Sequence, residues 1–428
     1  MVCHSVCRLN QCRKLIPQIS PATTMNELSK NWLLLLSASI GLICSSIVLP
    51  FYSIGALVVP ITSEFGWSRS EFQLVILFST GAGVITAPIV GALVDRVGVR
   101  LMALAGLLGL GLALILASRS GGELWLFYLT YASMAVLGAG TIPVTWTRAV
   151  TATFFHQRGL ALGIMLSGTG ICAILIPQYT VWLVENFGWR TAYLGLAALP
   201  LCFAAPLVSL FFHPARVEPE EPEERAEAET GLTLVEAAAG YRFWILLISI
   251  FLVYIAMSGI VPNLIPALTD QGIPAQKAAT VISVLGLSVI AGRLIVGYLV
   301  DHYWAPGVAA LAISLSVLGS VILLGEPVFV LACVAGGLLG FAAGAELDLM
   351  SFLAAKYFGL LHYAKIYSWL YAALALASGI APSLFALIFD VTGSYAIGFA
   401  YCIVCFSASC VLLLCLGQYP DKFIGPPK

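Results

Sequence analysis

The chain has few charged residues for its length, and this scarcity excludes most classes of soluble protein. Only 10% of its 428 residues are charged, whereas soluble domains carry about a quarter. Hydrophobic residues make up 60% of the chain, and the mean hydropathy is +1.00. The hydrophobic residues come in long blocks and do not alternate with polar residues at the period that forms the core of a soluble protein. Water is therefore not the main solvent of this protein.

Three further absences narrow the function. The net charge of -1 leaves no basic face that could neutralise phosphates, so nucleic acid is not expected as a partner. The sequence has no glycine-rich phosphate loop, so ATP is not the expected energy source. It also shows no His/Glu metal cluster and no Ser/His pair. We therefore expect no enzymatic activity, no cofactor and no metal.

The N-terminal segment is the part of the chain least like the rest. It holds Cys3, His4, Cys7 and Cys12, but no second ligand cluster follows at a spacing that zinc would need. Residues 1–24 contain no apolar run, so they are not a signal peptide. Met25 is a candidate start, which would make residues 1–24 an extension outside the translated chain. The other cysteines lie within apolar blocks and are interpreted as small hydrophobic residues.

The apolar blocks are long enough to cross a membrane as helices, which takes about 20 residues each. Helix is expected because it satisfies its own backbone hydrogen bonds in lipid. Twelve such blocks occur, near residues 32–59, 72–94, 101–118, 124–150, 159–184, 190–212, 243–268, 278–300, 306–324, 328–354, 361–388 and 395–417. The fold class predicted is an all-α polytopic membrane protein with twelve transmembrane helices in two pseudo-symmetric bundles of six.

The distribution of basic residues predicts the orientation. With the N-terminus inside, the outer loops hold only Arg69, Arg119, Arg190 and Lys277, so both termini are expected in the cytoplasm. The short loops suit a bacterial inner (plasma) membrane. The expected organisation is an N-terminal segment, a six-helix bundle, an acidic linker, a second six-helix bundle and a tail, at 1–31, 32–212, 213–242, 243–417 and 418–428. The linker beyond Gly231 is expected to form a short amphipathic helix on the inner surface.

The two halves repeat each other at an offset of about 205 residues. GALVD at 91–95 returns as GYLVD at 297–301, and the block around Pro177 returns around Pro382. Parallel repeats of this kind place a substrate site near the midplane, between the halves. A duplicated six-helix unit therefore favours a transporter that works by alternating access.

The segment GALVDRVGVR at 91–100 resembles the signature between helices 2 and 3 of the major facilitator superfamily. The resemblance implies a latch that closes the cytoplasmic side, formed by Gly91, Asp95, Arg96, Gly98 and Arg100. The simpler interpretation of these charges is that they only set the topology. Softer motifs, including FGWSRSEF at 65–72 and GRLIVGYLVD at 292–301, are similar to the monocarboxylate and oxalate–formate carrier branch.

Four ionisable residues lie inside the expected helices, and such residues mark functional sites by default. They are Arg148, Arg293, Glu346 and Asp348. Counted from the nearest inner markers, Arg148, Arg293 and Asp348 share a depth of roughly 12–15 Å from the cytoplasmic helix ends. A shared depth makes pairing among them geometrically possible.

Arg293 falls where the resembling carboxylate carriers place an arginine in helix 8, which implies a carboxylate-binding role. A guanidinium fork grips a carboxylate with two hydrogen bonds and stays charged. The alternative is a structural arginine paired permanently with Glu346 or Asp348. The carriers' other charged residues in helices 1, 8 and 11 are absent, so a dicarboxylate is disfavoured unless Arg148 supplies a second base.

Glu346 and Asp348 are candidates for proton coupling, because loss of water favours a protonated carboxyl group whereas a nearby arginine favours the charged form. They are two residues apart and point about 200° apart, so one of them is expected to face the cavity. The alternative is a gate in which one of them pairs with Arg148. Further expected liners of the cavity are Tyr52, Asn263 and Tyr367, with Trp146 beside them.

These features together predict a proton-coupled symporter for a small organic anion, a monocarboxylate, that works as a monomer by alternating access. Its expected partners are the anionic substrate, protons and the lipid bilayer. One alternative is a proton-driven efflux antiporter for amphipathic compounds, which would be indifferent to Arg293→Lys. Another is a non-transporting membrane sensor or scaffold, which would need larger soluble regions than the 30-residue linker.

Overall fold

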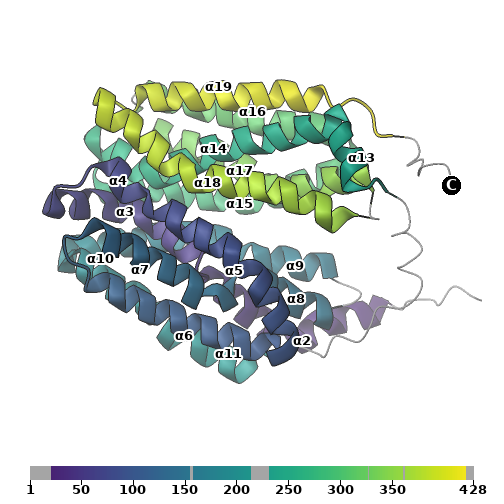
Figure 1. Cartoon of the computed structure of the whole chain (residues 1–428), viewed down its shortest axis with the longest axis horizontal. Helices are drawn as coiled ribbons and strands as arrows, with labels where there is room; N and C mark the ends of the chain where they lie inside the picture. The colour runs from purple at the N-terminus through teal and green to yellow at the C-terminus, as the bar shows by residue number, and fades with distance from the viewer. Residues whose placement is uncertain (1–20, 155–157, 214–230, 326, 360–361, 421–428) are drawn as a thin grey trace, which may run out of the picture.

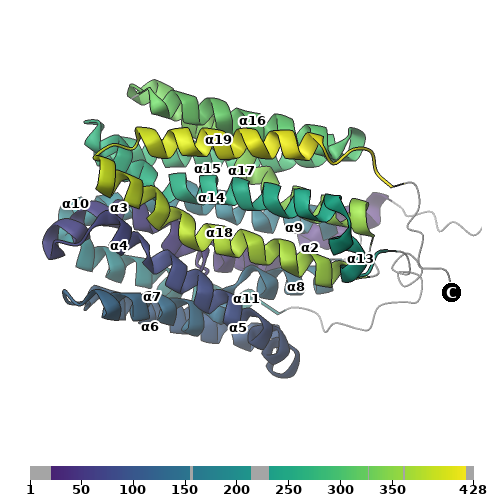
Figure 2. The same cartoon turned by 45° about the horizontal axis from the view of Figure 1, so that its top comes forward.

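The computed structural model describes residues 21–154, 158–213, 231–325, 327–359 and 362–420, and these form a bundle of roughly parallel and antiparallel helices (Figures 1 and 2). The elements of the first half are α2 (Pro21–Ile43), α3 (Val48–Phe65), α4 (Arg69–Gln73), α5 (Val75–Val97), α6 (Val99–Ser118), α7 (Leu124–Leu137), η1 (Ala139–Thr141), α8 (Pro143–Thr153), α9 (Arg158–Leu166), α10 (Gly168–Ala198), η2 (Leu199–Ala204) and α11 (Ala205–Phe211).

The second half begins with a short helix and continues with six long ones. These are α13 (Leu234–Ala239), α14 (Tyr241–Asp270), α15 (Ala275–His302), α16 (Ala305–Leu324), α17 (Phe329–Phe358), α18 (Tyr363–Thr392) and α19 (Ala396–Leu414). In Figure 1 the elements of the second half lie together above those of the first half. We call the end of the bundle where α2 begins and α19 ends the proximal end, and the opposite end the distal end.

Twelve crossings account for the described helices, as predicted from the sequence. Nine apolar segments in the described ranges are long enough to span a membrane. One of them, Leu160–Phe211, has 52 residues and turns back at Gly188, where φ is 80°, so it supplies two crossings. The helix α5 supplies another crossing, and α7 with α8 supplies the last. The fold class is therefore an all-α polytopic membrane protein.

Several of the expected single spans are broken helices, among them the blocks at 124–150 and 32–59. The block at 124–150 divides into α7, η1 and α8, because Pro143 starts α8 as its first residue and lacks the amide that would continue the helix before it. The block at 32–59 divides into α2 and α3, with Cys44–Ile47 between them. Such breaks need packing or side-chain partners within lipid. The amide of Ser46 donates to the Thr141 hydroxyl at 2.9 Å, so a side chain at the second break satisfies a backbone amide at the first.

The internal repeat is visible in the backbone conformation as well as in the amino-acid sequence. Pro177 and Pro382 both lie inside long helices, α10 and α18. Eleven residues after each proline the chain passes through a glycine with positive φ, Gly188 at 80° and Gly393 at 70°. Glycine takes this conformation without the steric cost that a Cβ adds. The corresponding helices of the two halves therefore both turn at a glycine with positive φ.

The linker helix predicted after Gly231 is α13. Its first turn is closed by a capping box in which the Thr233 hydroxyl accepts from the Glu236 amide and the Glu236 carboxylate accepts from the Thr233 amide at 2.8 Å. The hydrogen bonds from the Thr233 amide and hydroxyl hold the pKa of Glu236 below its ordinary value. Residues 214–230, the acidic part of the linker, lie outside the described residues.

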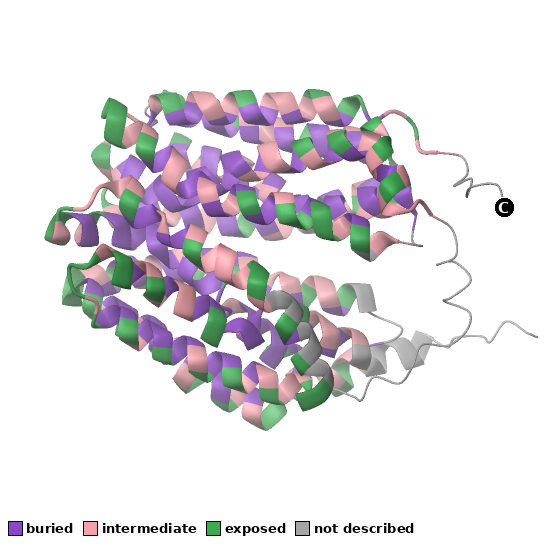
Figure 3. Cartoon of the chain, in the orientation of Figure 1, coloured by how far each residue is buried: buried purple, intermediate pink, exposed green. Residues whose placement is uncertain are grey.

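Buried residues line the inside of the bundle and exposed residues its outside (Figure 3). Unlike in a soluble protein, many of the exposed side chains are large and apolar. On α6 the exposed side chains Leu101, Leu108, Leu112 and Leu116 follow a helical spacing and are each about half exposed, at 49–57%. An apolar outer stripe of this kind suits contact with lipid chains, and the buried stripe of α6 packs into the core of its own half.

Close crossings between the halves depend on glycine. At Gly55 of α3, a Cβ would collide with the Pro262 carbonyl of α14, and at Gly170 of α10 it would collide with the Gly286 carbonyl of α15. Small residues allow such backbone approach within a membrane. The halves therefore meet along α3 with α14 and along α10 with α15, as well as where α18 packs against α4 and α5.

An arginine clamp joins the halves at the distal end. Arg69, at the start of α4, forms an ion pair with Asp270 at the end of α14, with 2.5 Å between Nη1 and Oδ2, and also donates to the Tyr395 hydroxyl. Its guanidinium lies 4.3 Å from the centre of the Phe389 ring. The backbone amide of Ser70 donates to Asp390 at 2.8 Å, which adds a second carboxylate to the clamp.

A second layer of cross-half contacts lies below the clamp. Gln73 Nε2 donates to Asn263 Oδ1 at 2.8 Å, seven residues before Asp270 and so about 10 Å deeper along α14. On another crossing, Gln178 of α10 donates to Thr280 of α15 at 2.8 Å. These contacts hold the two halves together at the distal end.

The glycine crossing between α15 and α17 provides a first test. A Cβ on Gly344 would overlap the Val289 carbonyl of α15 and press on the Arg293 amide, whereas one on Gly297 would meet no atom within 4 Å. We expect Gly344→Ala to destabilise the protein by about 1–3 kcal/mol through overpacking, and Gly297→Ala to be neutral or slightly stabilising. Thermal unfolding in detergent measures both, and equal melting temperatures would contradict the crossing.

The distal clamp provides a second test. We expect Arg69→Gln to shift the population toward conformers parted at the distal end by about fivefold, the size of a partly exposed ion pair. Spin labels at Gly121 and Val391, in a background with the native cysteines replaced, report the distance between the halves. The matched control is Arg190→Gln, because Arg190 pairs with Glu64 at 2.8 Å within the first half alone. An unchanged distance distribution for Arg69→Gln would rule out the clamp.

Candidate functional site

Arg293 lies in α15 and reaches across to the first half. Its Nη1 donates to the Leu166 carbonyl at 2.6 Å. Leu166 is the last residue of α9, and Ser167 separates it from α10, so this carbonyl lies at a helix break. The Thr169 hydroxyl donates to the same carbonyl at 2.9 Å. The arginine is half-buried, nine residues before the proximal end of α15, which places it about 13 Å deep.

Glu346 lies near the middle of α17, and only 9% of its surface is exposed. Its Oε1 has no hydrogen-bond partner among the described residues. A buried polar atom of this kind is rare and needs an explanation. Charge at this position carries a large desolvation cost, so the carboxyl group is suited to a role in which it gains and loses a proton.

Tyrosines from three helices surround these two ionisable groups. Tyr52 of α3 lies within electrostatic range of both Arg293 and Glu346. Tyr254 of α14 lies within range of the same pair and of Tyr367 and Tyr371 of α18. Tyr52 packs against the apolar cores of both halves, so the group is situated where the halves meet. We call Tyr52, Tyr254, Arg293, Glu346, Tyr367 and Tyr371 the central cluster.

The central cluster contains predicted residues and residues that the sequence did not single out. Tyr52, Arg293, Glu346 and Tyr367 were expected there. Tyr371 follows Tyr367 by four residues and so lies on the same face of α18, a spacing that could have identified it. Tyr254 carries no such signal, because it is one aromatic residue in a continuous apolar run.

Asn263 lies outside the central cluster. Its Nδ2 donates to the carbonyls of Gly259 and Pro382, at 2.9 and 3.1 Å, and its Oδ1 accepts from Gln73. These hydrogen bonds place it in the distal contact between the halves. Trp146 is likewise outside the cluster, since its indole nitrogen donates to the Thr141 carbonyl at 2.8 Å within the core of the first half.

The structure describes the side chain of one of the two remaining charged candidates, Arg148 and Asp348. Arg148 is half-buried on α8 of the first half. Asp348 is in α17, but its side chain is outside those described, so its pairing with Arg148 or Arg293 stays a prediction. The choice between coupling and gating for this carboxylate is likewise a prediction.

The latch motif lies at the proximal turn between α5 and α6. Gly98 has φ 93° and begins α6 as its cap, which explains the need for glycine in the motif. Arg96 is exposed, and Arg100 donates to the Ser209 carbonyl of α11. This contact of Arg100 is within the first half. The side chains at Gly91 and Asp95 are outside those described, so the latch stays a prediction.

Curated relatives carry two kinds of name. The chain is 27% identical over 290 residues to human monocarboxylate transporter 11, covering 67% of this chain and 59% of that protein. It is 26% identical over 372 residues to the mouse protein of the same name, covering 82% and 79%. It is also 32% identical over 162 residues to multidrug resistance protein MdtG of Klebsiella pneumoniae (strain 342), covering 37% and 38%.

A solved structure shares the fold. It is a bacterial homologue of the human lysosomal transporter Spinster, in an inward-facing and unoccupied conformation, and it matches 91% of this chain and 95% of its own with a TM-score of 0.64. At 16% sequence identity this likeness supports the fold alone. The model of the Major Facilitator Superfamily matches residues 32–324 and 246–426 of the chain. This protein is a membrane transporter of the major facilitator superfamily.

Proposed function

We propose that the protein is a proton-coupled symporter of a small organic anion, with a monocarboxylate as the substrate class. The observation that carries the proposal is the central cluster, in which one arginine and one buried carboxyl group both lie within electrostatic range of Tyr52 and Tyr254. Arg293 would bind the substrate carboxylate, and Glu346 would carry the proton. The relatives named monocarboxylate transporter support this substrate class.

The binding step follows from the chemistry of Arg293. In the structure its guanidinium donates to the Leu166 carbonyl, a neutral acceptor at a helix break. An arriving carboxylate offers two charged acceptors and so forms the stronger, bidentate contact. The tyrosine hydroxyls nearby supply further donors, and their rings supply apolar walls. Substrate binding would thereby exchange a bridge between the halves for a bridge through the substrate.

The coupling step follows from the burial of Glu346. A carboxylate bound at Arg293 would bring negative charge toward Glu346, and nearby negative charge favours the protonated form of a carboxyl group. Glu346 would then bind a proton as the substrate arrives, so that anion and proton cross together as a neutral pair. A neutral pair avoids the cost of moving net charge through a medium of low dielectric constant.

We also propose that the proximal end faces the cytoplasm in a bacterial inner (plasma) membrane, with the linker 213–242 and both termini on that side. Of the four basic residues expected outside, Arg69, Arg119 and Lys277 lie at helix ends at the distal end, and Arg190 follows the turn of α10 at Gly188. The two six-helix bundles, 32–212 and 243–417, would rock about the central cluster, and the protein would act as a monomer.

A second candidate is proton-driven efflux of amphipathic compounds. It is favoured by the relative named multidrug resistance protein MdtG and by the aromatic walls of the central cluster. In that case the protein would tolerate Arg293→Lys, and its overexpression would confer resistance to several toxic compounds.

Replacement of Arg293 by lysine tests the substrate class. We expect the KM for the transported carboxylate to rise about tenfold to a hundredfold, because an ammonium group cannot form the bidentate contact. Uptake of a labelled carboxylate panel into proteoliposomes, with and without an inward proton gradient, measures the change. Arg190→Lys, on the exposed distal surface, is the control. Normal kinetics for Arg293→Lys would favour the efflux function.

Replacement of Glu346 by glutamine tests the coupling. Glutamine keeps the size of the side chain but cannot exchange a proton at the carboxyl group. We expect gradient-driven accumulation to disappear, while substrate exchange between equal concentrations stays within about twofold, since Arg293 still binds the anion. Glu64→Gln, which removes an exposed distal carboxylate, serves as the control. A Glu346→Gln protein that still concentrates substrate against a gradient would exclude Glu346 as the proton carrier.

A further inference from the structure

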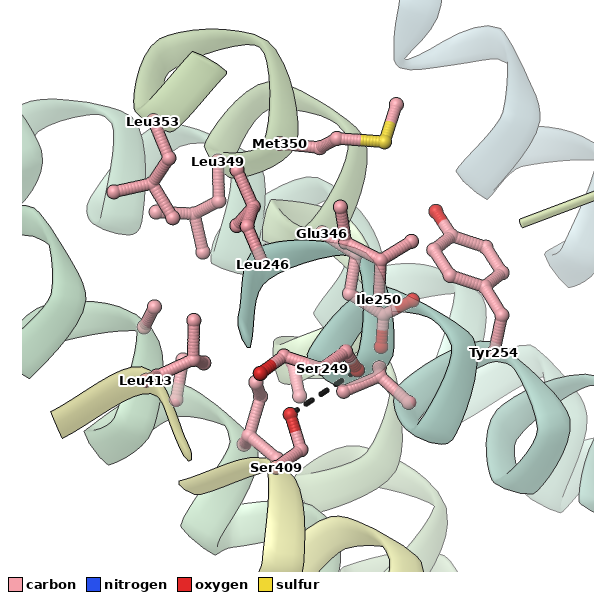
Figure 4. A pocket seen from close by; sticks show the side chains of 15 residues that line it. Leu246, Ser249, Ile250, Tyr254, Glu346, Leu349, Met350, Leu353, Ser409 and Leu413 are labelled. Atoms are coloured by element: carbon pink, nitrogen blue, oxygen red, sulfur yellow. Dashed lines mark hydrogen bonds between the residues drawn. The ribbon is translucent and has the colours of Figure 1, made fainter. Parts of the chain in front are cut away.

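The central cluster borders a small apolar pocket inside the second half of the protein. Figure 4 shows Glu346 and Tyr254 on the wall of this pocket, beside Ile250 and Met350. Most of the described lining is aliphatic. A polar contact of the cluster lies instead toward the first half, where Arg293 of α15 donates to the Leu166 carbonyl.

This contact of Arg293 belongs to a longer seam between the halves, formed by α15 and α10. Ser283 of α15 donates to the Ile174 carbonyl of α10 at 2.7 Å, and Gln178 of α10 donates to the Thr280 hydroxyl of α15 at 2.8 Å. Ser283 and Thr280 precede Arg293 by ten and thirteen residues, which places them about 15–20 Å away along α15, toward the distal end. Arg293 therefore makes the most proximal of the described hydrogen bonds along the seam.

The contact of Arg293 differs from that of Ser283 because its acceptor is shared. The Thr169 hydroxyl donates to the Leu166 carbonyl at 2.9 Å, and Arg293 Nη1 donates to the same oxygen at 2.6 Å. A backbone carbonyl has two lone pairs and can accept both hydrogen bonds. At the Ile174 carbonyl, Ser283 is the side-chain donor among the described residues.

A shared acceptor makes the guanidinium of Arg293 easier to release. Two donors on one oxygen divide its negative charge, so each hydrogen bond is weaker than it would be alone. When Arg293 leaves, the Thr169 hydroxyl remains on the Leu166 carbonyl. An acceptor that loses a partner without replacement costs free energy, and water is scarce within a lipid bilayer. The hydroxyl therefore lowers the cost of parting Arg293 from the first half.

We propose that Thr169 is a positioning residue that tunes the affinity for the anion by weakening the bridge from Arg293 to the Leu166 carbonyl. The inference rests on the proposed function, because it concerns the release of Arg293 to a substrate carboxylate. Thr169 acts through the carbonyl and does not need to touch the substrate. Its place in the first turn of α10, directly after the helix break at Ser167, holds the hydroxyl beside that carbonyl.

Replacement of Thr169 by valine removes the hydroxyl and keeps the branched shape of the side chain. We expect the substrate concentration that half-saturates exchange to rise about fivefold, the effect of about one hydrogen bond, because Arg293 is then held more tightly by the first half. The maximal exchange rate should stay within about twofold. Exchange of a labelled carboxylate across proteoliposomes with substrate on both sides measures both quantities and does not involve the return of the empty carrier.

The controls separate this role from a general effect of losing a hydroxyl in α10. The Thr180 hydroxyl is also buried in α10 and donates to the Ile176 carbonyl at 2.7 Å. Thr180→Val and the conservative Thr169→Ser should both leave the half-saturating concentration within about twofold of the wild type. An unchanged value in Thr169→Val, or an equal rise in Thr180→Val, would overturn the proposal. A fall in maximal rate alone would also overturn it.

A measurement without substrate distinguishes this inference from the proposed function. Heteronuclear NMR of the full-length protein grown on isotope-labelled arginine reports the exchange of guanidinium protons with water, and the Arg293 signals are identified by their loss in Arg293→Lys. We expect Thr169→Val to slow the exchange of the Arg293 Nη protons about fivefold, and Thr180→Val to leave it unchanged. If the wild type accumulates no carboxylate, the symport function fails. Unchanged proton exchange in Thr169→Val would instead overturn the role of Thr169.

Discussion

The rest of the structure depends on the inability of a lipid interior to hydrate polar groups. Every backbone amide and carbonyl within the bilayer must find its partner inside the chain. This constraint explains why the described crossings are helices. The same constraint explains why the break between α2 and α3 is bonded to the break between α7 and α8, through the hydrogen bond from Ser46 to Thr141. It also explains why glycines such as Gly170 appear where backbones from the two halves approach each other.

The residues of the proposed function are those whose polar groups have an exchangeable partner or lack one among the described residues. The Leu166 carbonyl lies at the break between α9 and α10 and is bonded by Arg293 from the other half. The Glu346 carboxyl group is enclosed without a partner for Oε1. Under the proposed function, an anion would give the arginine a stronger acceptor and a proton would neutralise the buried carboxyl group. A binding site whose hydrogen bonds are all made within the protein would gain little free energy from binding a substrate.

The contacts between the halves differ with depth, and this difference suits a rocking motion. At the distal end they are numerous and include a charged clamp around Arg69, supported by Gln73 and Asn263 below it. At the level of Arg293 the described link is a hydrogen bond to a backbone carbonyl. Hydrogen bonds and ion pairs of this size can be exchanged for others at modest cost. Glycine-lined crossings between α10 and α15 bring the backbones of the two halves into close contact.

By itself the sequence determined the number and type of crossings, the repeat and the four intramembrane charges, because hydrophobic length and the rarity of charge are local properties. It also suggested Tyr52, Arg293, Glu346 and Tyr367 as members of one site, and their role in transport stays a prediction. Only the tertiary structure decided that Asn263 belongs to the distal contact, that Arg69 bridges the halves and that Tyr254 joins the central cluster. These facts depend on which faces of distant helices meet, and helical periodicity in one segment carries no information about the segment that packs against it.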